Sequence, residues 1–147
     1  MNLLLGDVET EPDKALARVG PWEIPVPAGI PAGKVVVGIR PEHLGVPEFV
    51  AAFDQGAPAE VVVDEAENPG GVSLLHFTVD AQQVDVRDDD GSDAAFTLGP
   101  GPATVIAAVD PRTQAVAGSR LTLAVDSSRI RFFDAVTGLA LRVNGDR

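Results

Sequence analysis

Short apolar runs separated by turn-forming residues dominate the chain. Stretches rich in Val, Ile, Leu and Phe are interrupted by Gly and Pro, of which the sequence has 15 and 12. This punctuation leaves few windows long enough for a stable helix. Short strands at regular spacing are typical of a barrel or a sandwich. The pattern therefore predicts an all-β fold.

The apolar runs also predict where individual strands lie. We expect strands at residues 2–8, 22–27, 35–39, 59–64, 72–79, 83–87, 104–109, 121–125 and 129–133. Residues 13–19 have the composition of a helical turn, which Gly20-Pro21 would end at once. Residues 68–71, Asn-Pro-Gly-Gly, predict a hairpin turn that leads into strand 72–79.

The stretch 35–44 is the most informative part of the sequence. It opens with branched aliphatic residues around one glycine, which indicates a strand covered on both faces. Pro41 ends this strand, holds Arg40 extended and suits the first position of a helical turn. Glu42 then lies near the positive end of that turn's dipole. We therefore expect Arg40, Glu42 and His43 to form a charged cluster at the mouth of a buried strand.

Composition places the chain among globular proteins. Its 147 residues are 45% hydrophobic, which predicts one domain with a substantial core. No apolar run is long enough for a membrane helix, and the first residues lack the basic segment of a signal peptide. The absence of cysteine excludes disulfides and thiolate metal sites. The net charge of −11 favours solubility and disfavours binding to nucleic acid.

Nucleotide-hydrolysing motifs are missing. The nearest candidate for a P-loop is Gly33-Lys34, but Ala28 replaces the first glycine and Val35 replaces the hydroxyl residue. Residues 61–65 mimic a Walker B strand, although hydrophobic strands that end in acids are common. No Leu-Ser-Gly-Gly signature is present. We expect no catalytic residue and no ATP hydrolysis by this chain alone.

Metal-binding patterns are also missing. The acidic run 88–93 has the wrong register for a calcium loop, because Val86 would stand first and Thr97 twelfth. It is better explained as a solvated hairpin turn at Asp90-Gly91. His43 and His76 are the only histidines, and no spacing between them and an acid resembles a metal site. We expect no metal and no cofactor, with His76 held in its strand by a local partner.

Three segments resemble one known family in the family's own order. Residues 38–44, Gly-Ile-Arg-Pro-Glu-His-Leu, resemble a signature of the C-terminal regulatory domain of sugar-importer ABC transporter ATPases, the maltose and glycerol-3-phosphate type. Residues 124–141 are similar to that domain's closing pattern, a Val-Asp-Pro-x-Arg strand followed by Phe-Asp-x-x-Thr-Gly-x-x-Leu. Met1-Asn2-Leu3-Leu4 resembles its opening segment.

The resemblance implies an OB-like barrel of the TOBE/MOP-like type. The whole of 1–147 would be one regulatory domain, and an ATPase domain would precede Met1. Residues 13–19 would be its second strand. About 92–116 depart from the family as an insertion, which either adds strands to the barrel or loops away from it.

The motifs also imply roles for individual residues. Positions that would contact another subunit or a regulator are Arg40, Glu42, His43, Phe133, Asp134 and Thr137. Positions that would serve structure are Gly38, Ile39, Pro41, Leu44 and Gly138. As an alternative, Arg40 and Glu42 could pair with each other or with a neighbouring strand. Asp134 can also cap the turn that follows it, which Gly138 would end with a positive φ.

The function implied by the resemblance is accessory. The domain would regulate and help to dimerise the ATP-binding subunit of an importer of sugars or related solutes. Its partners would be an ATPase domain, a second ATPase subunit, the permease complex and a cytosolic regulator, in the cytoplasm at the inner face of the membrane without insertion into it. An alternative is a free-standing barrel that binds a sugar or an oxyanion. An OB-fold for single-stranded nucleic acid ranks last, because the chain is acidic and has one Trp and no Tyr.

Overall fold

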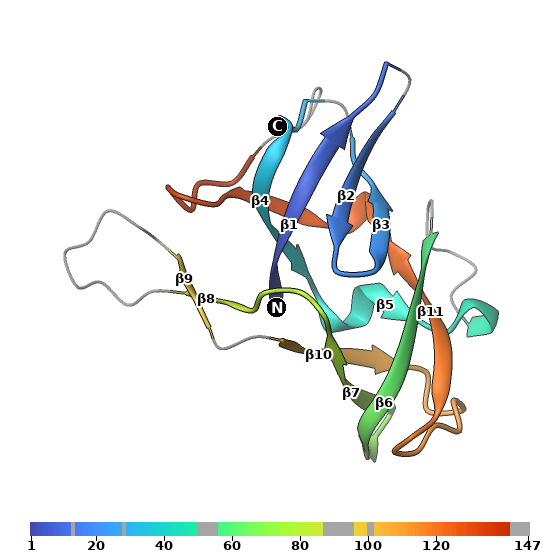
Figure 1. The fold of residues 1–147 in the computed structure, drawn as a ribbon. Coiled ribbons are helices and arrows are strands. Elements are labelled where there is room, and N and C mark those ends of the chain that lie inside the picture. Colours follow the sequence, from blue (N-terminus) through green and yellow to red (C-terminus); the bar gives the residue numbers. More distant parts are fainter. Residues whose placement is uncertain (13, 28, 50–55, 87–95, 100–101, 142–147) are drawn as a thin grey trace.

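Two five-stranded antiparallel sheets form the body of the protein. The computed structural model describes residues 1–147 apart from 13, 28, 50–55, 87–95, 100–101 and 142–147. The two sheets enclose one continuous core (Figure 1). The predicted all-β class is therefore confirmed.

The first sheet contains the central strand of the sequence. Its order is β12 (Arg131–Asp134), β4 (Gly33–Ile39), β1 (Asn2–Thr10), β2 (Ala15–Val19) and β3 (Trp22–Pro25). Strand β2 replaces the helical turn that its composition favoured. Ala17 and Val19 face the core while Arg18 faces solvent, so burial follows the two-residue period of a strand.

The second sheet curls towards a barrel. Its order is β10 (Ala103–Val109), β7 (Val72–Val79), β6 (Gly56–Gly70), β11 (Arg120–Asp126) and β5 (Leu44–Gly45). Strand β5 also lies beside β10, which brings the two edges of the sheet together. This curled half-barrel confirms the expected OB-like architecture.

Strand β4 is covered on both faces, as its unbroken apolar sequence predicted. Val35, Val37 and Ile39 belong to the core between the sheets. Val36 and Gly38 face the other way and are buried as well. Because neither face meets water, this strand needs no polar residue in alternation.

The segment 92–116 contributes strands to the fold. Part of it forms β10, whose Ala103, Val105, Ala107 and Val109 face the core and whose backbone pairs with β7. Another part forms β9 (Phe96–Leu98), which pairs with β8 (Val84–Val86) in a small separate sheet. The segment therefore completes the barrel through β10.

Several predicted boundaries were wrong. Strand β6 runs from Gly56 to Gly70, well past the expected end at residue 64, and its register with β7 shifts twice. The hairpin therefore turns only after Gly70, which has φ 118°. Strand β12 begins at Arg131, because residues 127–129 form a 3-10 helix, η3 (Ser127–Arg129). Ile130 and Phe132 are both buried in the core.

Among the described residues, no helix is long and apolar enough to cross a membrane. The described helices are the short 3-10 turns η1 (Pro41–His43), η2 (Pro47–Phe49) and η3. The expected hairpin turn within the acidic run 88–93 lies outside the described residues, as do the last residues 142–147.

Candidate functional site

The charged cluster lies where β4 leaves the first sheet. Arg40 is extended, with φ −73° and ψ 145°, and Pro41 takes the first position of η1. The His43 amide donates to the Arg40 carbonyl at 2.9 Å, which closes the turn. Helix η1 lies against β10, and Leu44 after it is fully buried. The predicted roles of Pro41 and Leu44 in shaping this corner are consistent with the geometry.

Neither charge of the cluster is neutralised locally. Arg40 and Glu42 are exposed, and neither forms an ion pair or a side-chain hydrogen bond with any described residue. Within the described part of the chain, these two residues pair neither with each other nor with a neighbouring strand, contrary to the alternative interpretation. His43 is half-buried, and its Nδ1 is enclosed without a hydrogen-bond partner among the described residues. This corner thus presents one cation, one anion and one unsatisfied imidazole.

Asn2 fixes this corner and was not singled out by the sequence. Its Nδ2 donates to the Ile39 carbonyl at 3.1 Å and to the Ile106 carbonyl at 2.9 Å. Its Oδ1 accepts from the Ile106 amide at 3.0 Å. The Asn2 side-chain amide therefore links the backbones of β4 and β10 by hydrogen bonds. The Met-Asn pair of the opening segment was the available signal.

The Asp134 turn is a second predicted feature, and its charge is satisfied internally. Asp134 Oδ1 accepts from the amides of Val136 and Thr137, both at 2.8 Å. These two hydrogen bonds, that from Thr137 first, lower the pKa of Asp134. Gly138 ends the turn with φ 76°, and Leu141 then pairs back to β12. The expected cap and positive φ are confirmed.

Phe133 is engaged within the chain. Its ring meets the ring of Phe96 on β9 edge to face, with centroids 6.0 Å apart. A Cβ on Gly38 would lie 3.1 Å from Phe133 Cε2 and would also approach Met1 and Leu3. Gly38 therefore gives room for the side chains that cover the outer face of β4.

The six expected contact residues do not form one surface. Asp134 pairs with Val35 at the start of β4, whereas Arg40 follows its end. An extended strand of that length separates the two by roughly 16 Å. In Figure 1 the Asp134 turn lies beside the upper end of β4 and η1 follows its lower end. Arg40, Glu42 and His43 make one group, and Phe133, Asp134 and Thr137 make another.

The closing motif contains a buried carboxylate. Asp126 is 3% exposed, and its Oδ1 accepts from the Ser128 hydroxyl at 2.7 Å. Arg129 Nε lies 3.5 Å from Asp126 Oδ2. The aspartate and arginine of this motif therefore hold η3 together at the end of β11.

One group of side chains could hold a metal ion. Glu65 and Glu67 on β6 and His76 on β7 bring their ligand atoms within 4.8 Å of one another. His76 Nε2 is 3.0 Å from Glu67 Oε1, although the approach is not that of a hydrogen bond. The sequence missed this group because only the hairpin register places Glu65 opposite His76. The expectation that His76 has a local partner agrees with the short distance to Glu67.

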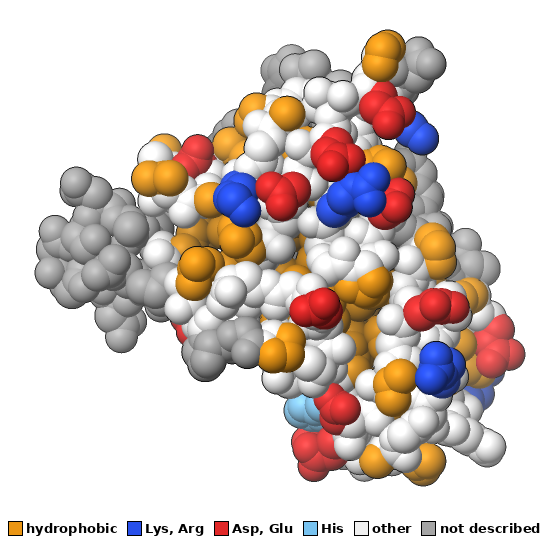
Figure 2. Space-filling model, viewed as in Figure 1, with side chains coloured by type: hydrophobic (Ala, Val, Ile, Leu, Met, Phe, Trp, Pro, Cys, Tyr) orange, Lys and Arg blue, Asp and Glu red, His pale blue; other side chains and the backbone are white. Residues whose placement is uncertain are grey.

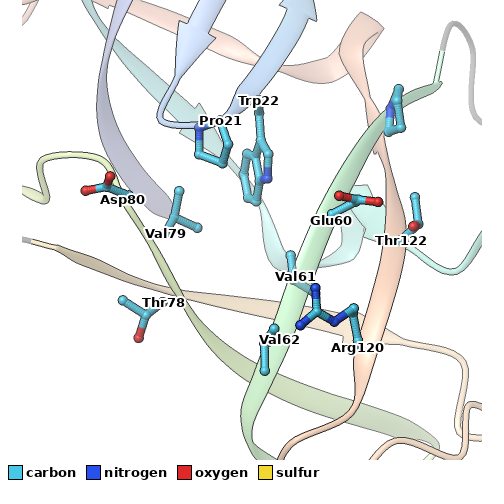
Figure 3. Close-up of a pocket in the computed structure, with 11 residues that line it drawn as sticks. Pro21, Trp22, Glu60, Val61, Val62, Thr78, Val79, Asp80, Arg120 and Thr122 are labelled. Carbon is cyan, nitrogen blue, oxygen red and sulfur yellow. The ribbon is translucent and has the colours of Figure 1, made fainter.

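A cleft opens in the second sheet, against the loop before β3, on the face shown in Figure 2. It has a volume of about 580 Å³ and lies between the early part of β6, the end of β7 and the loop before β3. Figure 2 shows hydrophobic side chains in the hollow and acidic side chains on both sides of it. Figure 3 shows Pro21 and Trp22 between the two strands, with Glu60 and Arg120 on one side and Asp80 on the other. Sequence analysis did not predict this cleft, and the single tryptophan was the one available signal.

The fold and the motif geometry define an OB-like barrel domain, and comparisons give its relatives. No family model matches the chain. It is 31% identical over 109 residues to the sulfoquinovosyl glycerol transport ATP-binding protein SmoE of Agrobacterium fabrum, a match that covers 74% of this chain and 23% of the relative. It is 27% identical over 112 residues to the trehalose import ATP-binding protein SugC of Mycobacterium tuberculosis, covering 74% and 28% respectively.

The resemblance to sugar-importer ABC ATP-binding subunits is therefore confirmed. The chain spans about a quarter of the length of the curated relatives that it matches.

Proposed function

We propose that the chain is the C-terminal regulatory and assembly domain of an ATP-binding subunit of a sugar importer. The observation that carries this proposal is the similarity of 74% of the chain to two such subunits. The OB-like barrel and the order of the three motifs support it. ATP hydrolysis would belong to a separate domain N-terminal to Met1. The regulatory domain formed by this chain would work in the cytoplasm beside the permease.

The surface proposed for subunit or regulator contact is the Arg40, Glu42 and His43 group. Exposed charges without local partners can pair across an interface, where complementary charges set register and specificity. Two copies related by a two-fold axis could place Arg40 of one copy against Glu42 of the other. The buried strand and the Asn2 bridge hold the corner in place, so little order is lost on association.

The second group is better suited to structure than to contact. Phe133 packs against Phe96, and the Asp134 carboxylate accepts two hydrogen bonds from amides of its own turn. Thr137 is exposed, and its Oγ1 accepts from the Leu139 amide at 3.2 Å. We assign this group to closing the barrel.

The test of the domain assignment is the native gene upstream of the Met1 codon. The proposal expects an in-frame continuation that encodes a P-loop and an ABC signature. A stop codon followed by a ribosome-binding site would contradict it, and the chain would then be a free-standing barrel.

A further inference from the structure

The cleft exists because β6 changes partners. Its first half pairs with β11, up to Val62 opposite Arg120. Its pairing with β7 begins only at Val63, opposite Phe77. The backbone of β7 beyond Phe77 is therefore not paired with β6, and the two strands are joined there by the Thr78 hydroxyl, which donates to Asp64 Oδ2 at 2.7 Å. The gap between the two strands is the 580 Å³ cleft, within the range of roughly 300–1,000 Å³ for small-molecule pockets.

The side of the cleft towards the first sheet is formed by the tight loop Gly20-Pro21 and by Trp22. Gly20 has φ 56°, and a Cβ there would lie 2.7 Å from the Asp80 carbonyl, so the loop can sit against β7 only with glycine. Trp22 is 3% exposed, and its ring lies 6.1 Å from that of Phe77 between centroids. These contacts fix the indole at the base of the cleft.

The indole N–H is the buried donor that points to a ligand. Trp22 Nε1 is enclosed and has no hydrogen-bond partner among the described residues. Figure 3 shows this nitrogen on the edge of the ring that faces β6. An unpaired buried donor is unfavourable, and an oxygen entering between β6 and β7 would satisfy it after a small adjustment of the lining.

The rim of the cleft carries both hydrogen-bond acceptors and hydrogen-bond donors. Glu60 and Asp80 are exposed acceptors, and Arg120 is an exposed donor that reaches from β11 towards the cleft in Figure 3. None of the three forms an ion pair with a described residue. Thr122 stands opposite Glu60 and adds a hydroxyl. The two carboxylates disfavour an anion, and the guanidinium disfavours a cation.

We propose that this cleft binds a neutral, polyhydroxylated ligand, of the chemical class of sugars. Vicinal hydroxyls can donate to the carboxylates and accept from Arg120 and Trp22, and the ligand's C–H faces can pack on Val62 and Pro21. The proposal goes beyond the proposed function and does not depend on it. None of Arg40, Glu42 and His43 lines the cleft.

The single tryptophan makes the cleft directly observable. Because the chain has one Trp and no Tyr, its intrinsic fluorescence reports on Trp22 alone. We would titrate the chain with maltose and trehalose as neutral probes, and with glycerol phosphate and molybdate as anionic probes. The proposal expects a saturable change in emission with a neutral probe and none with the anions. Calorimetry on the same samples gives the affinity without depending on the fluorophore.

Two exposed rim variants and one matched control assign the response to the cleft. Glu60→Gln and Arg120→Gln remove one charge each, and both side chains lie on the surface, where substitution leaves the fold intact. Each should weaken binding by about tenfold or more, as expected for a hydrogen bond to a charged group. Glu48→Gln makes the same change at an exposed position outside the cleft and should leave the affinity unchanged.

Three results would overturn the proposal. They are the absence of saturable binding of either neutral probe, stronger binding of an anion, and equal affinities for Glu60→Gln and Glu48→Gln. Whether an ATPase domain is encoded upstream of Met1 affects none of these binding measurements. Failure of the ligand proposal can therefore be distinguished from failure of the domain assignment.

Discussion

The two ends of β4 differ in how the carboxylate beside each end is satisfied. Each end places a carboxylate next to a tight turn, Asp134 at the start and Glu42 after the end. Asp134 accepts two amide hydrogen bonds from its own turn, whereas Glu42 and its neighbour Arg40 have no described partner. A charge that is satisfied locally stabilises the fold. A charge held on a rigid corner without a partner is available to another molecule.

The rigidity of the open corner comes from groups that carry no charge. Asn2 bridges β4 and β10 with three hydrogen bonds, and Gly38 lets bulky side chains cross the strand. Substitutions at these residues should unfold the protein more readily. Substitutions at Arg40 and Glu42 should alter association alone. The predictions below test this division, beginning with the largest expected effect on stability.

Asn2→Ala should cause the largest loss. It removes three hydrogen bonds at the junction of the two sheets, at about 1 kcal/mol each, so the free energy of unfolding should fall by about 3 kcal/mol. Urea denaturation would measure it as a lower midpoint with an unchanged slope. Asn68→Ala, the same change at an exposed position, is the control. Equal effects of the two variants would mean that the bridge contributes nothing.

Gly38→Ala should have the next largest effect. The new Cβ would lie 3.1 Å from Phe133 Cε2, and relieving that contact should cost about 1–2 kcal/mol. Gly71→Ala is the matched control, because a Cβ there meets nothing within 4 Å. Urea denaturation of both variants measures the difference. A Gly38 variant as stable as the Gly71 variant would show that the outer layer over β4 is loosely packed.

Acid should weaken the Asp134 turn. The pKa of Asp134 is lowered by the Thr137 and Val136 amides, so the carboxylate form stabilises the fold. That contribution is complete above the unfolded pKa of about 3.9 and is lost as the pH falls through the lower folded pKa. Asp134→Ala should therefore lower Tm at pH 7 by an amount that shrinks as the pH falls through that window. A constant difference in Tm across the pH range would contradict the capping role.

The same measurement has an internal reference at Asp110. Hydrogen bonds from Arg112 lower the pKa of Asp110 to about 2, so its contribution disappears at a lower pH than an ordinary aspartate would give. In an Asp110→Asn background, the effect of Asp134→Ala on Tm should keep the same dependence on pH.

The charge swap Arg40→Glu with Glu42→Arg should have the smallest effect on stability. Both side chains are exposed and unpaired among the described residues, and the swap keeps the net charge of the chain. The free energy of unfolding should stay within about 0.5 kcal/mol of the parent value. A larger loss, measured by the same urea titration, would mean that these charges serve the fold.

The sequence predicted the elements whose burial is strongest. Strand β4 was evident because an apolar run without alternation is typical of a strand that is buried on both faces. The Asp134 cap and Gly138 were evident because their chemistry is local to one turn. The second strand was recovered only through the family resemblance, since the composition of residues 13–19 favoured a helical turn and the alternation of Ala17 and Val19 outweighed it.

What the sequence could not predict depends on register over long separations. Asn2 meets Ile106 across 104 residues, and Glu65 meets His76 only through a hairpin whose register shifts. The cleft at Trp22 arises because β6 leaves β7 for β11 at Val62, a change of partner that leaves no mark in a local pattern. The length of β6 was underestimated because Asn68-Pro69 reads as a turn while the strand continues to Gly70.

The central claim is that the open end of β4 is an assembly surface and the closed end is not. Sedimentation equilibrium at high micromolar to millimolar concentration tests it on the parent chain, Arg40→Glu, the Arg40→Glu/Glu42→Arg swap and Asp134→Ala. The account predicts self-association of the parent, of Asp134→Ala and of the swap, whose two copies stay complementary, and weaker association of Arg40→Glu, which sets a like charge against Glu42 of the other copy. A parent that stays monomeric at millimolar concentration, or an Arg40→Glu variant that associates as the parent does, would contradict it.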